Sequence, residues 1–128
     1  MKTHNLDATN QIVGRFATKI ANLLMGKGLP TYVPYLNRGD EVVISNADKI
    51  KFTGKKMTQK LYTRYSGYPG GLSKTTPAEL KIKNPKEIIR HAVYGMLPNN
   101  KLRDQQIKKL KLRLLAMGRF AGVYINCP

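Results

Sequence analysis

Lysine, arginine and tyrosine side chains alternate through residues 55–74, a combination suited to binding nucleic acid. The cations can neutralise phosphates and the tyrosine rings can stack on unpaired bases, which favours RNA over the deep groove of duplex DNA. A glycine-rich run at 67–71 would let backbone amides approach a phosphate closely. Packing in the core or across strands is the alternative role for the tyrosines. The RNA-binding candidates here are Lys55, Lys56, Lys60, Tyr62, Arg64, Tyr65 and Lys74.

A second basic stretch occupies residues 101–113. On a helix, Lys108 and Lys111 would share a face. A basic helix lying on a membrane is the alternative, but this stretch lacks the bulky Trp or Phe side chains that such helices use. We expect RNA contacts here and from cations on or after the first predicted helix, which together are Arg103, Lys108, Lys109, Lys111, Arg15, Lys19 and Lys27.

The positive charge is concentrated in the second part of the chain. The formal net charge is +16; residues 1–48 hold five Lys and Arg against four Asp and Glu, whereas residues 49–128 hold eighteen against three. Such concentrated charge repels itself and destabilises a compact monomer, so it indicates a large polyanionic partner. Nucleic acid is the first candidate.

Two glycine–lysine motifs resemble phosphate-binding loops, and both fail the pattern. The motif at 54–56 would need glycine at position 49 and Ser or Thr at 56, but lysine occupies both positions. The motif at 26–28 would need glycine where the chain has Ala21. Nucleotide binding through such a loop is therefore not expected.

No catalytic or metal-binding group emerges from the remaining polar residues. Glu79 and Glu87 occupy helix-capping positions. Asp7 and Asp48 border predicted strands and could approach each other, although turn or cap roles are commoner. His4 lies near a terminus expected to fray, His91 flanks the apolar face of its helix, and Cys127 has no positioned base. We predict no enzyme activity, no metal, no cofactor and no small-molecule substrate.

The 128 residues are most simply one domain, long enough to bury a core without metal or disulfide. A single cysteine excludes an internal disulfide and fits a reducing compartment. No apolar run approaches the roughly 20 residues of a membrane span, and the N-terminal residues lack the apolar stretch of a secretory signal. We expect a soluble, cytoplasmic protein without a membrane partner.

Hydrophobic periodicity predicts alternating helices and strands. Ile12, Phe16, Ile20 and Leu24 recur at helical spacing within 11–26, and Gly26-Lys27-Gly28 ends this helix. The β-branched run 41–45 is typical of a strand buried on both faces of a parallel sheet. Alternation predicts partly solvated strands at 50–53 and 61–65, and the Gly/Pro density predicts a loop at 67–71.

Two further helices have similar starts, Thr76-Pro77-Ala78-Glu79 and Asn84-Pro85-Lys86-Glu87. Each places a capping side chain before a proline at the first helical position and a glutamate at the third. The second helix carries an apolar stripe and closes at Pro98. The segment 101–113 is predicted to begin as a helix and to pass into a strand at 112–115. This alternation favours an α/β layered domain.

Four blocks, in order, resemble the bacterial large-subunit ribosomal protein L-thirteen family, over about residues 5 to 112. The first comprises Asp7-Ala8, Gly14-Arg15-Phe16-Ala17-Thr18, Ala21 and Gly26-Lys27. The second is the run 39–44 followed by Asn46-Ala47-Asp48-Lys49. The third is Thr53-Gly54-Lys55-Lys56, Lys60-Leu61-Tyr62, Tyr65-Ser66-Gly67 and Gly70-Gly71-Leu72. The fourth is Val93-Tyr94-Gly95-Met96-Leu97-Pro98 with Lys109-Leu110-Lys111.

The resemblance implies a three-layer α/β/α domain around a mainly parallel four-stranded sheet, with basic loop and C-terminal extensions. It also implies a structural constituent of the large ribosomal subunit, a cytoplasmic particle, that binds 23S-type ribosomal RNA and supports early assembly. Matching positions imply RNA contacts from part of the candidate set above: Lys55, Lys56, Lys60, Tyr62, Lys74, Lys109 and Lys111. Gly95, Met96, Leu97 and Pro98 would end the helix and aim the basic segment at RNA.

The chain departs from the family pattern at two places. Residues 103–104 are Arg-Asp where the family commonly has a Gly-Arg pair, and the family's usual Gly…His-Pro-His-type tail is missing. We therefore divide the chain into one RNA-binding domain, residues 1–115, and a divergent tail, residues 116–128. Neighbouring large-subunit proteins are expected partners, and homo-oligomerisation is not expected. An enzyme that binds nucleotides or transfers phosphoryl groups on a similar layered fold is the alternative function.

Overall fold

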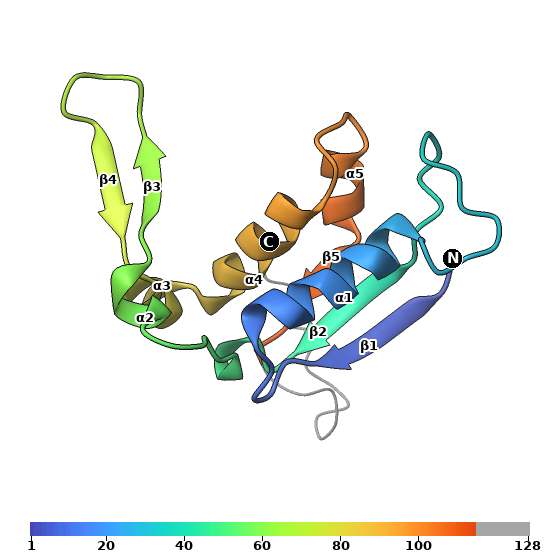
Figure 1. Cartoon of the computed structure of the whole chain (residues 1–128), viewed down its shortest axis with the longest axis horizontal. Coiled ribbons are helices and arrows are strands. Elements are labelled where there is room, and N and C mark those ends of the chain that lie inside the picture. The colour runs from blue at the N-terminus through green and yellow to red at the C-terminus, as the bar shows by residue number, and fades with distance from the viewer. Residues whose placement is uncertain (115–128) are drawn as a thin grey trace, which may run out of the picture.

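The computed structural model describes residues 1–114, which form a parallel sheet, five α-helices and a projecting antiparallel hairpin (Figure 1). The strands are β1 (Thr3–Asp7), β2 (Glu41–Ser45), β3 (Tyr62–Tyr65), β4 (Leu72–Thr75) and β5 (Leu110–Leu112). The helices are α1 (Val13–Met25), α2 (Lys56–Gln59), α3 (Pro77–Lys83), α4 (Pro85–Met96) and α5 (Arg103–Lys108), with a 3-10 turn at Ala47–Lys49.

The sheet has the strand order β1-β2-β5, with every pair parallel. Val42 of the central strand pairs with Leu110 of β5, and Glu41 pairs with Thr3 of β1. Val42 and Ile44 belong to the main core, whereas Val43 points to the other face and is 7% exposed. Burial of both faces of β2 is therefore confirmed, as is the α/β class with a mainly parallel sheet. Three strands form this sheet within residues 1–114, and the α/β/α layering stays a prediction.

The core lies between the sheet and the apolar stripes of two helices. Phe16, Ile20 and Leu24 of α1 pack with Ile88, Ile89 and Val93 of α4, and all six are buried. Figure 1 shows α1 and α4 side by side, and the two helices contact each other. Their spacing of three and four residues puts these side chains on one face of each helix, so the sequence-based prediction of both helices is confirmed.

The chain leaves α1 through a close contact between two glycines. Gly26 has a φ of +75°, and its backbone N–H closes the helix on the carbonyls of Asn22 and Leu23. Gly39 then packs directly on the carbonyl of Leu24, where an added Cβ would overlap the oxygen. The amide of Asp40 donates to the carbonyl of Leu23 at 3.1 Å. This junction brings the loop before β2 against the end of α1.

The two predicted helix starts differ in their caps. Thr76 accepts a hydrogen bond from the amide of Glu79 at 3.4 Å, which confirms the cap of α3. Asn84 makes no side-chain cap bond to α4, so that part of the prediction is wrong. Its backbone N–H still donates to the carbonyl of Leu80 at 2.7 Å, because Asn84 also ends α3. Pro85 nevertheless occupies the first turn of α4, as predicted.

Several predicted boundaries are corrected. The strand predicted at 50–53 is reduced to one parallel bridge between Ile12 and Lys51, because only Lys51 exchanges backbone bonds with the chain before α1. The strand predicted at 112–115 is β5 at Leu110–Leu112, so the preceding helix is shorter than expected. Short α2 and β4 were not predicted. The predictions for the tail at 116–128 and for Cys127 lie outside the described residues.

The prediction for His4 is also corrected, because this residue does not lie in a frayed terminus. It lies in β1, and its Nε2 is 2.9 Å from Oδ2 of Asp40. The backbone N–H of Lys2 donates to the other oxygen of Asp40 at 2.9 Å. These bonds hold the first strand to the start of β2.

Candidate nucleic-acid interface

The antiparallel pair β3–β4 projects away from the sheet (Figure 1) and presents two different faces. Tyr62 pairs with Thr75 and Arg64 with Ser73, and alternation puts these four side chains on one face. The opposite face carries the pairs Thr63–Lys74 and Tyr65–Leu72. The hairpin candidates predicted from sequence therefore do not form one continuous surface.

The tyrosines of this region have different roles. Tyr62 is half-buried, and its ring makes an edge contact with His91 of α4, with centroids 5.1 Å apart and planes at 74°. Burial raises the pKa of the Tyr62 phenol. Tyr65 and Tyr68 are 63% and 74% exposed. Packing against α4 thus occupies Tyr62 in part, whereas Tyr65 and Tyr68 are available to a partner.

Three predicted lysines lie together just before the hairpin. Lys55, Lys56 and Lys60 surround α2, and all three are exposed. The ammonium of Lys60 lies 5.0 Å from the centroid of the Tyr62 ring. Arg15, Lys19 and Lys27 are exposed on and just after α1, outside the two hairpin strands.

The second basic stretch contains cations with internal partners. The Nζ of Lys109 donates to Gly39 O at 2.7 Å, Asn37 Oδ1 at 2.9 Å and Asn37 O at 3.4 Å. Lys111 forms an ion pair with Glu41, whose carboxyl pKa it lowers. Both side chains hold β5 to the central strand and the loop before it. Any contact of Lys109 or Lys111 with RNA, as predicted from the sequence, would therefore come in addition to these internal bonds.

Arg103 locks the turn that follows α4. Its guanidinium donates to the carbonyls of Leu97 and Pro98, each at 3.1 Å, and lies 4.5 Å from the centroid of the Tyr94 ring. The predicted end of the helix over Gly95 to Pro98 is confirmed, since α4 ends at Met96 and Leu97 is buried. This geometry favours a structural role for Arg103. Lys108, by contrast, is exposed.

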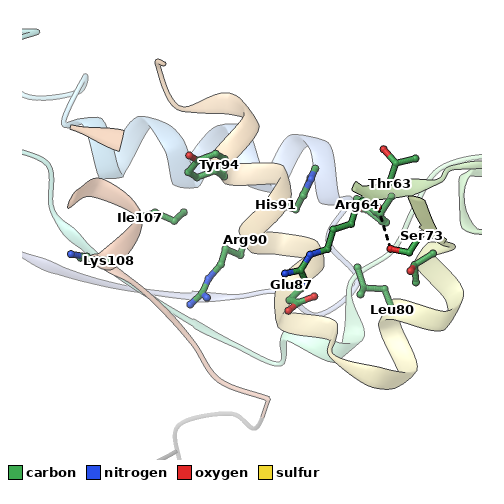
Figure 2. A pocket seen from close by; sticks show the side chains of 12 residues that line it. Thr63, Arg64, Ser73, Leu80, Glu87, Arg90, His91, Tyr94, Ile107 and Lys108 are labelled. Atoms are coloured by element: carbon green, nitrogen blue, oxygen red, sulfur yellow. Dashed lines mark hydrogen bonds between the residues drawn. The ribbon is translucent and has the colours of Figure 1, made fainter. Parts of the chain in front are cut away.

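A groove of about 740 Å³ separates the hairpin from α4 (Figure 2). Glu87, Arg90, His91 and Tyr94 lie along α4 at helical spacing and form one wall. The other walls come from β3, β4, α3 and α5, and comprise Tyr62, Thr63, Arg64, Ser73, Thr75, Leu80, Ile107 and Lys108. The groove thus joins predicted residues from both basic stretches.

Sequence reasoning missed the contribution of Arg90, His91 and Tyr94 to this surface. The signal was present, because positions 87, 90, 91 and 94 make one polar stripe opposite the buried face of α4. The fold of the hairpin over this stripe could not be predicted from that spacing. Lys74 and Tyr65, which sequence grouped with Tyr62 and Arg64, belong to the outer face of the hairpin instead.

The acidic residues near the sheet serve turns and strand contacts. Asp7 accepts hydrogen bonds from the side chain and amide of Thr9 and from the side chain of Asn46. These bonds lower the Asp7 pKa to about 2. The amide of Lys2 and the ring of His4 lower the pKa of Asp40. The predicted turn role of Asp7 is therefore confirmed.

Within residues 1–114, no group of three or more His, Cys, Asp or Glu side chains is arranged to hold a metal ion. Over the same range, none of the helices is long and apolar enough to cross a membrane. The fold and its surface define a small α/β protein that carries exposed cations around one hairpin and groove.

Comparison with known proteins identifies the family. The family profile of ribosomal protein L13 matches residues 1–113. The large ribosomal subunit protein uL13 of Trichlorobacter lovleyi is 51% identical over 107 residues, which cover 84% of this chain and 75% of that protein. The uL13 proteins of Salinibacter ruber and Thermus thermophilus are 52% and 50% identical over 107 residues each, 84% of this chain and 72% and 76% of theirs. This chain belongs to the ribosomal protein L13 family.

Membership confirms the resemblance found in the sequence. Proteins of this family are structural components of the ribosome, which also confirms the expectation that the chain is not an enzyme. The alternative of a nucleotide-binding or phosphoryl-transfer enzyme is therefore wrong.

Proposed function

We propose that this chain binds large-subunit ribosomal RNA through the cations around the hairpin and supports early assembly of the subunit. As a member of its family, the chain is a structural protein of the large ribosomal subunit. Neighbouring proteins of that subunit are its other proposed partners.

One observation carries the RNA-binding proposal: the segment 49–108, which contains the hairpin and the helices around the groove, has few acidic residues to compensate its positive charge. Residues 49–108 contain fourteen Lys and Arg against three Asp and Glu. Within residues 1–114, the close contacts between a basic and an acidic side chain are His4–Asp40 and Lys111–Glu41, so none of those fourteen cations is in an ion pair. Unpaired cations at this density repel one another in the free protein and release counterions from RNA when they bind phosphates.

The first experiment measures binding of the full chain to purified large-subunit ribosomal RNA as a function of salt. If six to ten phosphates are neutralised, affinity should fall by about 10³–10⁵ between 50 and 200 mM salt. The triple variant K55A/K56A/K60A should bind roughly 10- to 100-fold more weakly at 100 mM salt, with a salt slope smaller by about three. Its thermal unfolding should match the wild type, because exposed lysines add little stability.

The matched control is K2A/K51A/K83A, which removes three exposed lysines outside the predicted set. It should lose much less affinity than K55A/K56A/K60A. Equal losses would show that net charge, and not the surface around α2, governs binding. A flat salt response of the wild type would contradict the electrostatic basis of the proposal.

The role in early assembly has its own test. A protein that acts early should bind the protein-free RNA and should be retained on it before other large-subunit proteins are added. Stepwise reconstitution, followed by sedimentation, measures this order. A strict requirement for other proteins before binding would contradict the early role while leaving RNA binding intact.

A further inference from the structure

The groove between the hairpin and α4 is a concave site with walls from five elements, and its volume of about 740 Å³ is in the range of ligand-sized pockets, roughly 300–1,000 Å³. Segments distant in sequence meet there, since Arg64 comes from β3, Arg90 from α4 and Lys108 from the end of α5. Figure 2 shows Arg64 extending from β3 toward α4.

The charge of the groove is complementary to an anion. Arg64, Arg90 and Lys108 line it and are exposed, and none of them forms an ion pair within residues 1–114. Glu87 is the acidic residue among the lining side chains. Two arginines present planar guanidinium groups, which suit bidentate contact with phosphate oxygens.

Aromatic rings follow the same wall. Tyr62, His91 and Tyr94 all line the groove. Two of these rings already carry a cation: Lys60 lies over Tyr62 and Arg103 over Tyr94. Arg103 is itself held by two backbone carbonyls, so the Tyr94 ring is supported before any ligand arrives. A ring fixed in this way loses little freedom when a base stacks on it.

From these observations we infer that the groove binds an unpaired stretch of RNA, with phosphates on Arg64, Arg90 and Lys108 and a base stacked at His91 and Tyr94. This inference rests on the proposed function, which is binding of ribosomal RNA. It adds that one site, the groove, contacts a single-stranded stretch of that RNA. A duplex presents its bases already stacked, so a concave site lined by rings favours a single strand. Lys74 and Tyr65, on the outer face of the hairpin, lie outside this contact.

The test compares binding of the full chain to a mixed-sequence 12-nucleotide RNA without self-complementarity and to the same sequence as a duplex. The wild type should prefer the single strand. Variants R64A and R90A should each lower single-strand affinity and reduce the salt slope by about 0.7. The control K83A removes an exposed lysine of α3 that does not line the groove and should leave the slope nearly unchanged.

Stacking is tested by a pair of substitutions at one position. Y94L should weaken single-strand binding by about 5- to 150-fold, the range for loss of one base–aromatic stack, whereas Y94F should bind like the wild type. Thermal unfolding checks that Y94L still folds. If Y94L and Y94F bind equally well, or if R64A and R90A match K83A, the groove is not the RNA site.

A cross-link in the assembled particle distinguishes the occupants. A photoreactive residue in place of Ser73, which lines the groove, should cross-link to RNA in reconstituted large subunits. Cross-linking to another protein would overturn the inference and make the groove a protein-docking site. If K55A/K56A/K60A still weakens RNA binding in that case, the proposed function stands without the groove.

Discussion

At the sheet end of the molecule, formed by β1, β2, β5, α1 and the loop at 37–40, several charged side chains on the strands and the loop have partners inside the protein. Lys109 donates to Asn37 and Gly39, Lys111 pairs with Glu41, and Asp40 binds the amide of Lys2 and the ring of His4. These contacts join strands and loops that are far apart in the sequence. Charge at this end therefore holds the sheet together.

At the hairpin end, formed by α2, β3, β4 and the groove face of α4, cations of the same type have no acidic partner within residues 1–114. Their ordered neighbours are aromatic rings, as with Lys60 over Tyr62. The difference teaches that sequence position and residue type do not identify the lysines that hold the fold together. An internal acceptor distinguishes Lys109 and Lys111 from the exposed lysines that we propose to bind RNA.

Substitution of Gly39 should disturb the sheet end most. An added Cβ would overlap the carbonyl oxygen of Leu24, which is backbone and cannot move without shifting the end of α1. We expect G39A to lower the free energy of unfolding by about 3 kcal/mol, the upper part of the usual range for overpacking. This corresponds to a fall in Tm of roughly 10 °C. Urea and thermal unfolding measure both.

Gly14 provides the matched control, because nothing lies within 4 Å of a Cβ added there and the residue is in α1. G14A should stabilise the protein by roughly 0.5–1 kcal/mol through its helix propensity. RNA binding by G39A should persist at temperatures where it remains folded. If G39A unfolds like the wild type, the contact between the loop and α1 is looser than the structure indicates.

The neighbouring residues Lys108 and Lys109 test this difference directly, because Lys109 has internal acceptors and Lys108 is exposed. K109M should lower the free energy of unfolding by about 1–3 kcal/mol, since the carbonyls of Asn37 and Gly39 lose their charged donor. K108M should change stability by less than about 0.5 kcal/mol and should weaken RNA binding. Urea unfolding and RNA titration of the two variants, side by side, measure this contrast.

Methionine approximates the apolar stem of lysine and lacks its terminal nitrogen, so each variant removes mainly the ammonium group. The reverse result, with K108M destabilised and K109M weakened only in RNA binding, would break the division between the two ends. Equal losses of RNA affinity in two stable variants would show that Lys109 exchanges its internal acceptors for phosphates.

Local patterns in the sequence predicted the local parts of this structure. The apolar stripes of α1 and α4 follow helical spacing, and Pro77 and Pro85 mark the helix starts. Strand β4 was missed because Leu-Ser-Lys-Thr has no apolar alternation of its own. Strand β5 was misplaced because its alternation of Leu110, Lys111 and Leu112 continues a lysine-rich helix without a break.

The site was predictable in composition but not in arrangement. Basic and aromatic residues at 55–74 identified the hairpin region, yet Arg64 and Arg90 meet across the groove only through tertiary folding. The internal roles of Lys109 and Arg103 depend on carbonyls supplied by loops, which carry no side-chain signal. Such contacts between side chain and backbone are invisible to residue patterns.

Asp7 gives the smallest expected effect and tests the sheet end through pH. Its folded-state pKa of about 2 lies below the ordinary value of 3.8, because Thr9 and Asn46 donate to the carboxylate. A lowered pKa stabilises the fold fully above about pH 4, and this contribution is lost as the pH falls toward 2. D7N should therefore be less stable than the wild type at pH 6, with the difference shrinking between pH 4 and pH 2. Thermal unfolding across this range measures it.

The variant T9V separates the bonds that hold Asp7. It removes the hydroxyl donor, which is the largest cause of the lowered pKa, but keeps the Thr9 backbone N–H and the Asn46 amide. Its loss of stability should therefore fall between those of the wild type and D7N, and should shrink over the same pH range. Since Asp7 is exposed to solvent, the effect is screened and modest. A D7N variant with the same pH dependence as the wild type from pH 4 to 2 would show that this carboxylate does not link β1 to the end of β2.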